Sequence, residues 1–201
     1  MRPLFSLILL SFTTMSAIAQ SHDLSPDNQI FRDASYADFE VFMKIAQEAK
    51  EHRADRMLSL EKFQEMALDE NTIILDTRSK EMYDAKHIKG AIHLNFADFT
   101  QSTLATLIED TNTRILIYCN NNFLNDELYF PTKAMMPVDL EELRITSLPN
   151  GPEEYPVTMA LNIPTYINLY GYGYKNVYEL ADLISVYYEG IEFEGISVIS
   201  N

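Results

Sequence analysis

The spacing of apolar residues shifts along the chain between a helical repeat and short continuous runs. From Ala34 to about Glu51, apolar side chains recur three and four positions apart, which is typical of an amphipathic helix. A second short helix is expected after Ser59, because serine is favoured at the N-terminal cap of a helix. Further helical segments are expected at residues 80–85, at residues 103–109, and from Pro164 to Gly171 or Gly173.

Continuous apolar runs alternate with these helices. Residues 71–76 (NTIILD) and 113–118 (TRILIY) are apolar through their middle, as expected of strands that are buried on both faces of a parallel sheet. Shorter extended segments are expected at residues 91–94 and 176–180, and the tail 181–201 adds one or two apolar segments. The alternation predicts an α/β fold with a mainly parallel central sheet flanked by helices.

Residues 1–19 have the order of features found in a secretory signal peptide. Arg2 supplies a positive charge, the run from Leu4 to Ser11 is apolar, and Ala17-Ile18-Ala19 places small residues at the spacing of a cleavage site. The apolar run is too short to cross a hydrocarbon core of roughly 30 Å as a helix. The sequence therefore predicts export, to the periplasm or out of the cell, without stable membrane insertion.

The rest of the chain divides into an N-terminal helical extension at residues 20–56 and a main domain at residues 57–201. Within the main domain, residues 124–157 are rich in proline and acidic residues and have no clear periodicity. This pattern predicts an inserted loop with at most one helical turn, at Asp139–Leu143. A loop of this length inside a compact domain is usually either functional or mobile.

Charge and cysteine content exclude several classes of function. The chain has 15 Lys and Arg against 30 Asp and Glu, a formal net charge of -15, which disfavours nucleic acid and anionic membrane surfaces as partners. Its single cysteine excludes an internal disulfide and a multi-thiolate metal site. His87 and His93 lack an evident third ligand, so no metal or other cofactor is expected.

Cys119 follows directly on the predicted strand 113–118. Ligands of open α/β sheets bind outside the carboxyl ends of the strands, so a thiol at this position can act on a ligand. Backbone N–H groups of the following loop would stabilise its thiolate. The alternative is a buried thiol that serves as a small core residue, since free cysteine is among the most buried residue types.

Three segments, taken together, resemble the rhodanese-like domain family. They are LDTRSKEMYDAKHIKGAI at residues 75–92, ILIYC at residues 115–119 and GYGYKNVYEL at residues 171–180. The resemblance covers roughly residues 57–185 without the insertion, and it implies the rhodanese fold with Cys119 as the catalytic residue. It also implies that four residues form a structural motif of that fold: Asp76, Arg78, His87 and Gly90.

The loop after the cysteine departs from the family pattern. Sulfurtransferases of the family carry a cationic residue in this loop, whereas here Cys119 is followed by Asn-Asn-Asn-Phe-Leu-Asn. The related phosphatases need an arginine at position 125, which is asparagine in this chain. We predict that the loop residues Asn120, Asn121, Asn122 and Phe123 border the substrate, with amides in place of the cation, although the aromatic ring of Phe123 is more typical of a core position.

Two hypotheses of different class follow. The first is an exported rhodanese-like sulfurtransferase that carries sulfane sulfur as a persulfide on Cys119 and acts between a small sulfur donor and a thiol acceptor. The second is a catalytically inactive module of the same fold, which binds a protein partner through the acidic insertion or senses redox state through Cys119.

Overall fold

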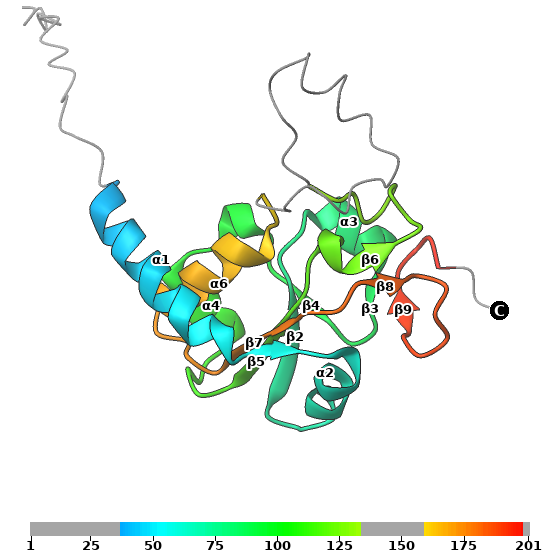
Figure 1. Ribbon diagram of the computed structural model, residues 1–201, viewed down its shortest axis with the longest axis horizontal. Coiled ribbons are helices and arrows are strands. Elements are labelled where there is room, and N and C mark those ends of the chain that lie inside the picture. The colour runs from blue at the N-terminus through cyan, green and yellow to red at the C-terminus, as the bar shows by residue number, and fades with distance from the viewer. Residues whose placement is uncertain (1–36, 134–158, 199–201) are drawn as a thin grey trace, which may run out of the picture. The chain divides into compact units, whose positions relative to one another are not determined.

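A five-stranded parallel sheet forms the centre of the described part of the protein (Figure 1). The structure is a computed structural model and describes residues 37–133 and 159–198. The strands lie in the order β1-β7-β5-β2-β4, and each neighbouring pair is parallel. Their bounds are β1 Met57–Leu58, β2 Thr72–Asp76, β4 Ile92–His93, β5 Arg114–Ile117 and β7 Val177–Leu180.

Helices cover both faces of this sheet. Alternate residues of β5 point to opposite faces. Ile115 and Ile117 join one core cluster with residues of α1, α4 and α6, while Leu116 joins the other with residues of α2. The sequence prediction of a mainly parallel α/β sheet flanked by helices is thus confirmed. The helices are α1 Phe39–Ala54, α2 Leu60–Ala67, α3 Lys80–Ala85, α4 Gln101–Leu107 and α6 Asn162–Gly171.

Side-chain caps fix where the helices begin. The Ser59 side chain accepts a hydrogen bond from the Lys62 N–H, which places the start of α2 where the sequence predicted it. Helix α1 begins later than the apolar repeat suggests, because the Asp38 side chain caps it by accepting from the Val41 N–H. Only the C-terminal half of α1 packs into the core. Ala49 in this half is buried in the same cluster as Ile115 and Ile117 of β5.

Two short strand pairs and two 3₁₀ turns complete the described elements. Strand β3 (His87–Ile88) pairs antiparallel with β9 (Phe193–Glu194), and β6 (Phe123–Leu124) pairs in parallel with β8 (Ile184–Ser185). The turns are η1 at Phe96–Asp98 and η2 at Asn120–Asn122. None of the helices in the described ranges is both long and apolar enough to cross a membrane.

The first ten residues of the predicted insertion are packed into the domain, unlike the loop that the sequence suggested. The Phe130 ring is fully buried and lies 4.5 Å from the Phe123 ring, centroid to centroid. Asp126 forms an ion pair of 2.9 Å with Lys86 at the end of α3. These contacts join residues 124–133 to the core. The predicted turn at Asp139–Leu143 and the predicted signal peptide lie outside the described residues.

Candidate active site at the carboxyl edge of the sheet

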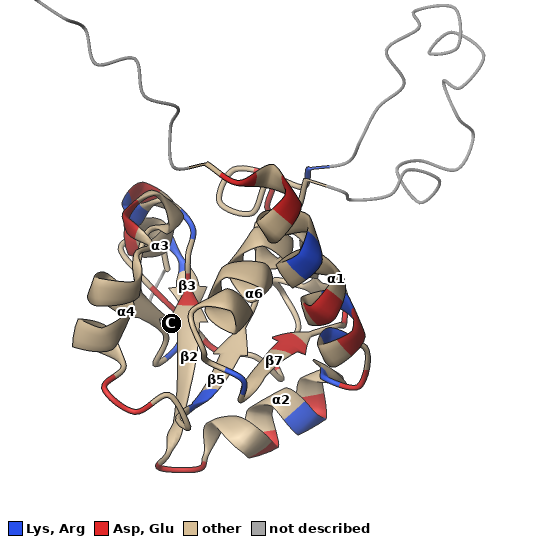
Figure 2. Ribbon diagram, turned by 90° about the vertical axis from the view of Figure 1, so that its left-hand side faces the viewer, with Lys and Arg blue, Asp and Glu red and all other residues tan. Residues whose placement is uncertain are grey.

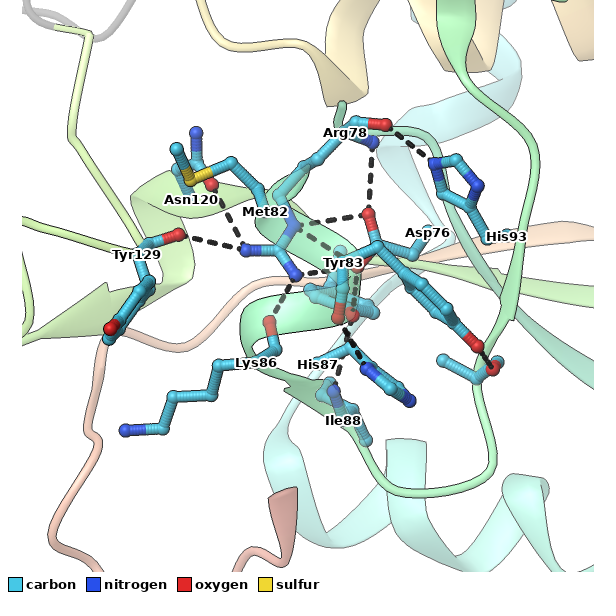
Figure 3. Close-up of polar contacts among 12 residues, drawn as sticks. Asp76, Arg78, Met82, Tyr83, Lys86, His87, Ile88, His93, Asn120 and Tyr129 are labelled. Atoms are coloured by element: carbon cyan, nitrogen blue, oxygen red, sulfur yellow. Dashed lines mark hydrogen bonds and ion pairs between the residues drawn. The ribbon is translucent and has the colours of Figure 1, made fainter. Parts of the chain in front are cut away.

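A buried ion pair stands at the carboxyl end of β2 (Figure 3). Asp76 is the last residue of the strand, and the Arg78 guanidinium binds both of its carboxylate oxygens, with Nε at 3.0 Å from each and Nη2 at 2.7 Å from Oδ2. The Tyr118 hydroxyl donates to the same Oδ2. Both charged side chains are almost completely buried. Each therefore needs the other as a counter-charge, because a single buried charge without a partner strongly destabilises the folded state.

The remaining Arg78 donors hold three other segments in place. Nη2 donates to the Lys86 carbonyl at 2.6 Å, and Nη1 donates to the Tyr129 carbonyl at 3.0 Å and to Asn120 Oδ1 at 3.4 Å. A guanidinium has five N–H donors, and each of these now has an acceptor. Arg78 therefore connects β2, α3, the segment around Tyr129 and the loop after Cys119, and it has no donor left for an anionic substrate.

The charge states of this cluster follow from its burial. Burial acts to lower the pKa of Arg78, but hydrogen bonds from its guanidinium to Asp76 and the charge of that carboxylate outweigh burial and raise the pKa. Burial, and then the nearby Asp76 charge, raise the pKa of Tyr118 well above its ordinary value. Tyr118 therefore stays neutral and serves as a hydrogen-bond donor to Asp76.

Cys119 lies two residues beyond the end of β5, on the same edge of the sheet as Asp76. It is only 3% exposed, yet it borders a cavity of about 210 Å³. Two cationic residues, Arg78 and Lys133, also border this cavity, so the chain fold brings Lys133 close to a loop that has no basic residue of its own. The apolar residues that line the cavity are Met82, Pro131, Ala160 and Leu161.

The asparagine loop uses much of its hydrogen-bonding capacity on itself. The Cys119 N–H donates to Asn122 Oδ1 at 2.9 Å, and the Asn122 N–H donates to the Cys119 carbonyl at 3.1 Å. The Phe123 N–H donates to the Asn120 carbonyl. The main-chain donors that can reach the sulfur are therefore the Asn122 N–H, which also approaches the Cys119 side chain, and the N–H groups of Asn120 and Asn121.

The four predicted substrate residues of the loop separate into two pairs. Asn120 and Asn121 border the Cys119 cavity. The Asn122 amide instead donates to the Leu180 and Asp182 carbonyls, at 2.9 and 3.1 Å, and so ties the loop to the segment after β7. The prediction that Phe123 borders the substrate is wrong, because its ring is 0% exposed and packs among other aromatic rings of the core.

His87 and Gly90 shape the segment after α3. His87 Nδ1 lies 2.6 Å from the Tyr83 carbonyl, and its ring stacks on the Tyr83 ring at 3.8 Å. His93 stacks on Tyr83 at 4.8 Å, and its Nε2 lies 2.8 Å from the Arg78 carbonyl. Gly90 has a φ of 79°, a left-handed conformation that favours glycine. These residues support the strand edge and lie outside the lining of the Cys119 cavity.

A second buried charge cluster was not predicted from the sequence. Acidic positions are red in Figure 2, and one of them falls on the β7 ribbon. Glu179 lies on β7 between β1 and β5, and Arg53 of α1 binds its two carboxylate oxygens at 2.5 and 2.6 Å. The Asn162 amide at the start of α6 also donates to Glu179. The sequence does carry a signal for this cluster: an acidic residue stands among the hydrophobic residues of VYEL, and a carboxylate in a buried strand requires a partner.

The comparison with protein families agrees with this geometry. Residues 59–135 match the sequence model of the rhodanese-like domain. The match assigns residues 59–135 to a rhodanese-like domain, and the mostly parallel sheet with a cysteine after β5 is consistent with that fold. The match ends at residue 135 and so includes the packed residues 124–133 that the sequence analysis assigned to an insertion.

A segment of the chain is also similar to a segment of longer proteins. It is 37% identical over 65 residues to proteins named tRNA uridine(34) hydroxylase in Streptococcus sanguinis strain SK36 and Streptococcus suis strain 05ZYH33. The matched segment is 31% of this chain and 20% of each relative, so the chain spans about a fifth of the length of these curated relatives. Among solved structures, the BH2092 protein from Bacillus halodurans matches with a TM-score of 0.31 and 22% identity, over 38% of this chain and 58% of that chain.

Proposed function

We propose that the protein is a rhodanese-type sulfurtransferase in which Cys119 carries sulfane sulfur as a persulfide. The observation that carries this proposal is the position of Cys119, at the carboxyl edge of a parallel sheet and on the wall of a cavity of about 210 Å³. A thiol that served only as a core residue would need no cavity beside it.

The proposed reaction has two displacement steps. The Cys119 thiolate attacks the outer sulfur of a donor and forms a new sulfur–sulfur bond. The sulfur–sulfur bond of the donor breaks, and its electron pair goes to the leaving group, which is a thiolate from a persulfide, a sulfinate from a thiosulfonate or sulfite from thiosulfate. Cys119 then holds the transferred sulfur as a persulfide anion. In the second step an acceptor thiolate attacks that outer sulfur, the persulfide bond breaks, and the Cys119 thiolate is regenerated.

The surroundings of Cys119 favour an organic sulfur donor over a small dianion. Arg78 spends its donors on protein oxygens. Negative charge in the cavity would then be held by Lys133, by the Ser79 hydroxyl and by the main-chain and side-chain amides of Asn120 and Asn121, and among these described groups Lys133 alone is cationic. Most of the remaining described lining is apolar. Thiosulfate is therefore expected to be a poor donor, and a donor with an apolar carbon group a better one.

The proposal includes export. The order of charge, apolar run and small residues within residues 1–19 supports it, and the partners would be small sulfur donors and thiol acceptors of the periplasm or the exterior. The sequence similarity to proteins named tRNA uridine(34) hydroxylase supports a catalytic rather than a purely structural role for the matched segment. The acidic composition of this chain disfavours a nucleic acid substrate.

Mass spectrometry of peptides from the treated protein tests the proposal. The purified protein is incubated with thiosulfate, an aromatic thiosulfonate or a low-mass alkyl persulfide, then alkylated and digested. We expect a peptide containing Cys119 with one added sulfur atom, formed more rapidly with the two organic donors than with thiosulfate. The added sulfur should disappear when a thiol acceptor is supplied, and the Cys119→Ser variant should never acquire it.

An absence of the persulfide with every donor would overturn the sulfurtransferase proposal. Reversible adducts on Cys119 after separate treatment with oxidised glutathione or with hydrogen peroxide, a mixed disulfide or a sulfenic acid, would then support the redox-sensing alternative.

A further inference from the structure

A small polar cavity lies behind the Cys119 loop, separate from the cavity that Cys119 borders. Its volume is about 120 Å³. Its wall includes the Glu179 carboxylate on β7, Arg53 on α1 and Asn162 at the start of α6, together with Asn121 and Asn122 of the loop. Three elements and the loop therefore meet around one polar space.

Two buried oxygen atoms of this wall have no hydrogen-bond partner among the described residues. They are Asn121 Oδ1 and Asn162 Oδ1, and the Asn162 residue is only 4% exposed. The orientation of the Asn162 amide is fixed, because its nitrogen donates to the Glu179 carboxylate, which can only accept. Buried amide oxygens of this kind are nearly always hydrogen-bonded in native proteins.

The charges around the cavity exclude a cation as the missing partner. Arg53 lines the space and already neutralises Glu179 through a two-point contact. A further cation would meet the Arg53 charge without a free carboxylate to balance it. The missing partner is therefore a small, neutral hydrogen-bond donor that can serve two acceptors.

We propose that this cavity is a binding site for ordered water, and that one water donates to both Asn121 Oδ1 and Asn162 Oδ1. A space of about 120 Å³ is sufficient for this molecule and a few neighbours, since one water needs roughly 10–15 Å³. Water also supplies the two donors that the two oxygens require.

The bound water makes Asn162 a positioning residue for the Cys119 loop. Asn121 borders both cavities. A water that bonds to its side chain and to Asn162 therefore fixes the cavity wall beside Cys119 relative to α6 and the Glu179–Arg53 pair. The water site stands independently, whereas this effect on Cys119 rests on the proposed function.

A double-mutant cycle combined with a crystal structure tests the proposal. The substitutions Asn121→Ala and Asn162→Ala are made singly and together, and the unfolding equilibrium constant is measured in urea. Two side chains that share a cavity can also couple through packing or through a direct amide contact, so the crystal structure is needed to assign the coupling to a water. We expect a coupling of at least about threefold in the unfolding constant. The lost Asn162–Glu179 hydrogen bond cancels in the cycle.

Asn168→Ala is the matched control. Asn168 lies on the same helix and donates to the Pro164 carbonyl at 2.8 Å, but it does not line the cavity. Its cycle with Asn121→Ala should be additive. Asn162→Ala should also change the rate of Cys119 alkylation by iodoacetamide at least threefold, whereas Asn168→Ala should leave that rate unchanged.

The crystal structure of the full chain decides the result even where a variant does not fold. Density for a water within hydrogen-bonding distance of both oxygens supports the proposal. An empty cavity, a direct contact between the two amides, or additive effects of Asn121→Ala and Asn162→Ala would overturn it. Coupling and water without any Cys119 persulfide would contradict only the proposed function and leave the water site standing.

Discussion

At the scale of single residues, Arg78 determines how the edge of the sheet is organised. Its side chain is buried, its charge is matched by Asp76, and its remaining donors reach oxygens on α3, near Tyr129 and on the Cys119 loop. The sequence alone indicated that Asp76 and Arg78 lie at a strand end. It did not indicate that Arg78 holds Asn120, because that contact joins residues far apart in the chain.

Removing the Arg78 charge should strongly destabilise the protein. Arg78→Met leaves the Asp76 carboxylate buried without a counter-charge, so the free energy of unfolding should fall by about 3–5 kcal/mol in urea titration. The double variant Asp76→Asn with Arg78→Met should lose clearly less than the sum of the two single losses. The exposed pair Lys80–Asp84 gives the control, since Lys80→Met should cost about 0.5 kcal/mol or less. A loss of that small size for Arg78→Met would contradict the assigned role.

At the scale of elements, the sequence predicted the long, regular segments and missed those stabilised by distant contacts. Strands β2 and β5 are continuous apolar runs, and α2 has a serine cap, so local signals suffice for them. Strand β6 has only two residues, and no periodicity can be detected at that length. The Phe123 ring of this strand is covered by the rings of Phe130 and Phe193. Neither the spacing of residues nor composition could predict that these rings lie beside it.

The two residues of β6 allow a matched comparison. Phe123 is fully buried among aromatic rings, whereas Leu124 is 40% exposed. Phe123→Ala should lower the free energy of unfolding by about 3–5 kcal/mol, and Leu124→Ala by about 0.5 kcal/mol. Thermal or urea unfolding of both variants measures the difference. Equal losses would show that Phe123 is not the core residue described above.

At the scale of the whole molecule, one acidic chain combines a rhodanese-like domain with an asparagine loop after its cysteine. Three sequence segments sufficed to predict the fold class, because each lies on a strand or turn of the parallel sheet. The chemistry of the site was harder to predict. The position of Cys119 followed from the strand before it, but the self-bonded asparagine loop, the approach of Lys133 and the polar cavity behind the loop arise only when distant segments pack.

Sulfur transfer at Cys119 requires that the thiol is reached from its cavity while the domain stays folded. The most direct test is the rate of Cys119 alkylation by iodoacetamide at several urea concentrations below the unfolding transition. Access through the cavity predicts a measurable rate that stays constant as urea increases, because no unfolding is needed. A rate that rises with urea as steeply as the global unfolding constant would mean that the thiol reacts only in the unfolded chain, and would contradict an active site at Cys119.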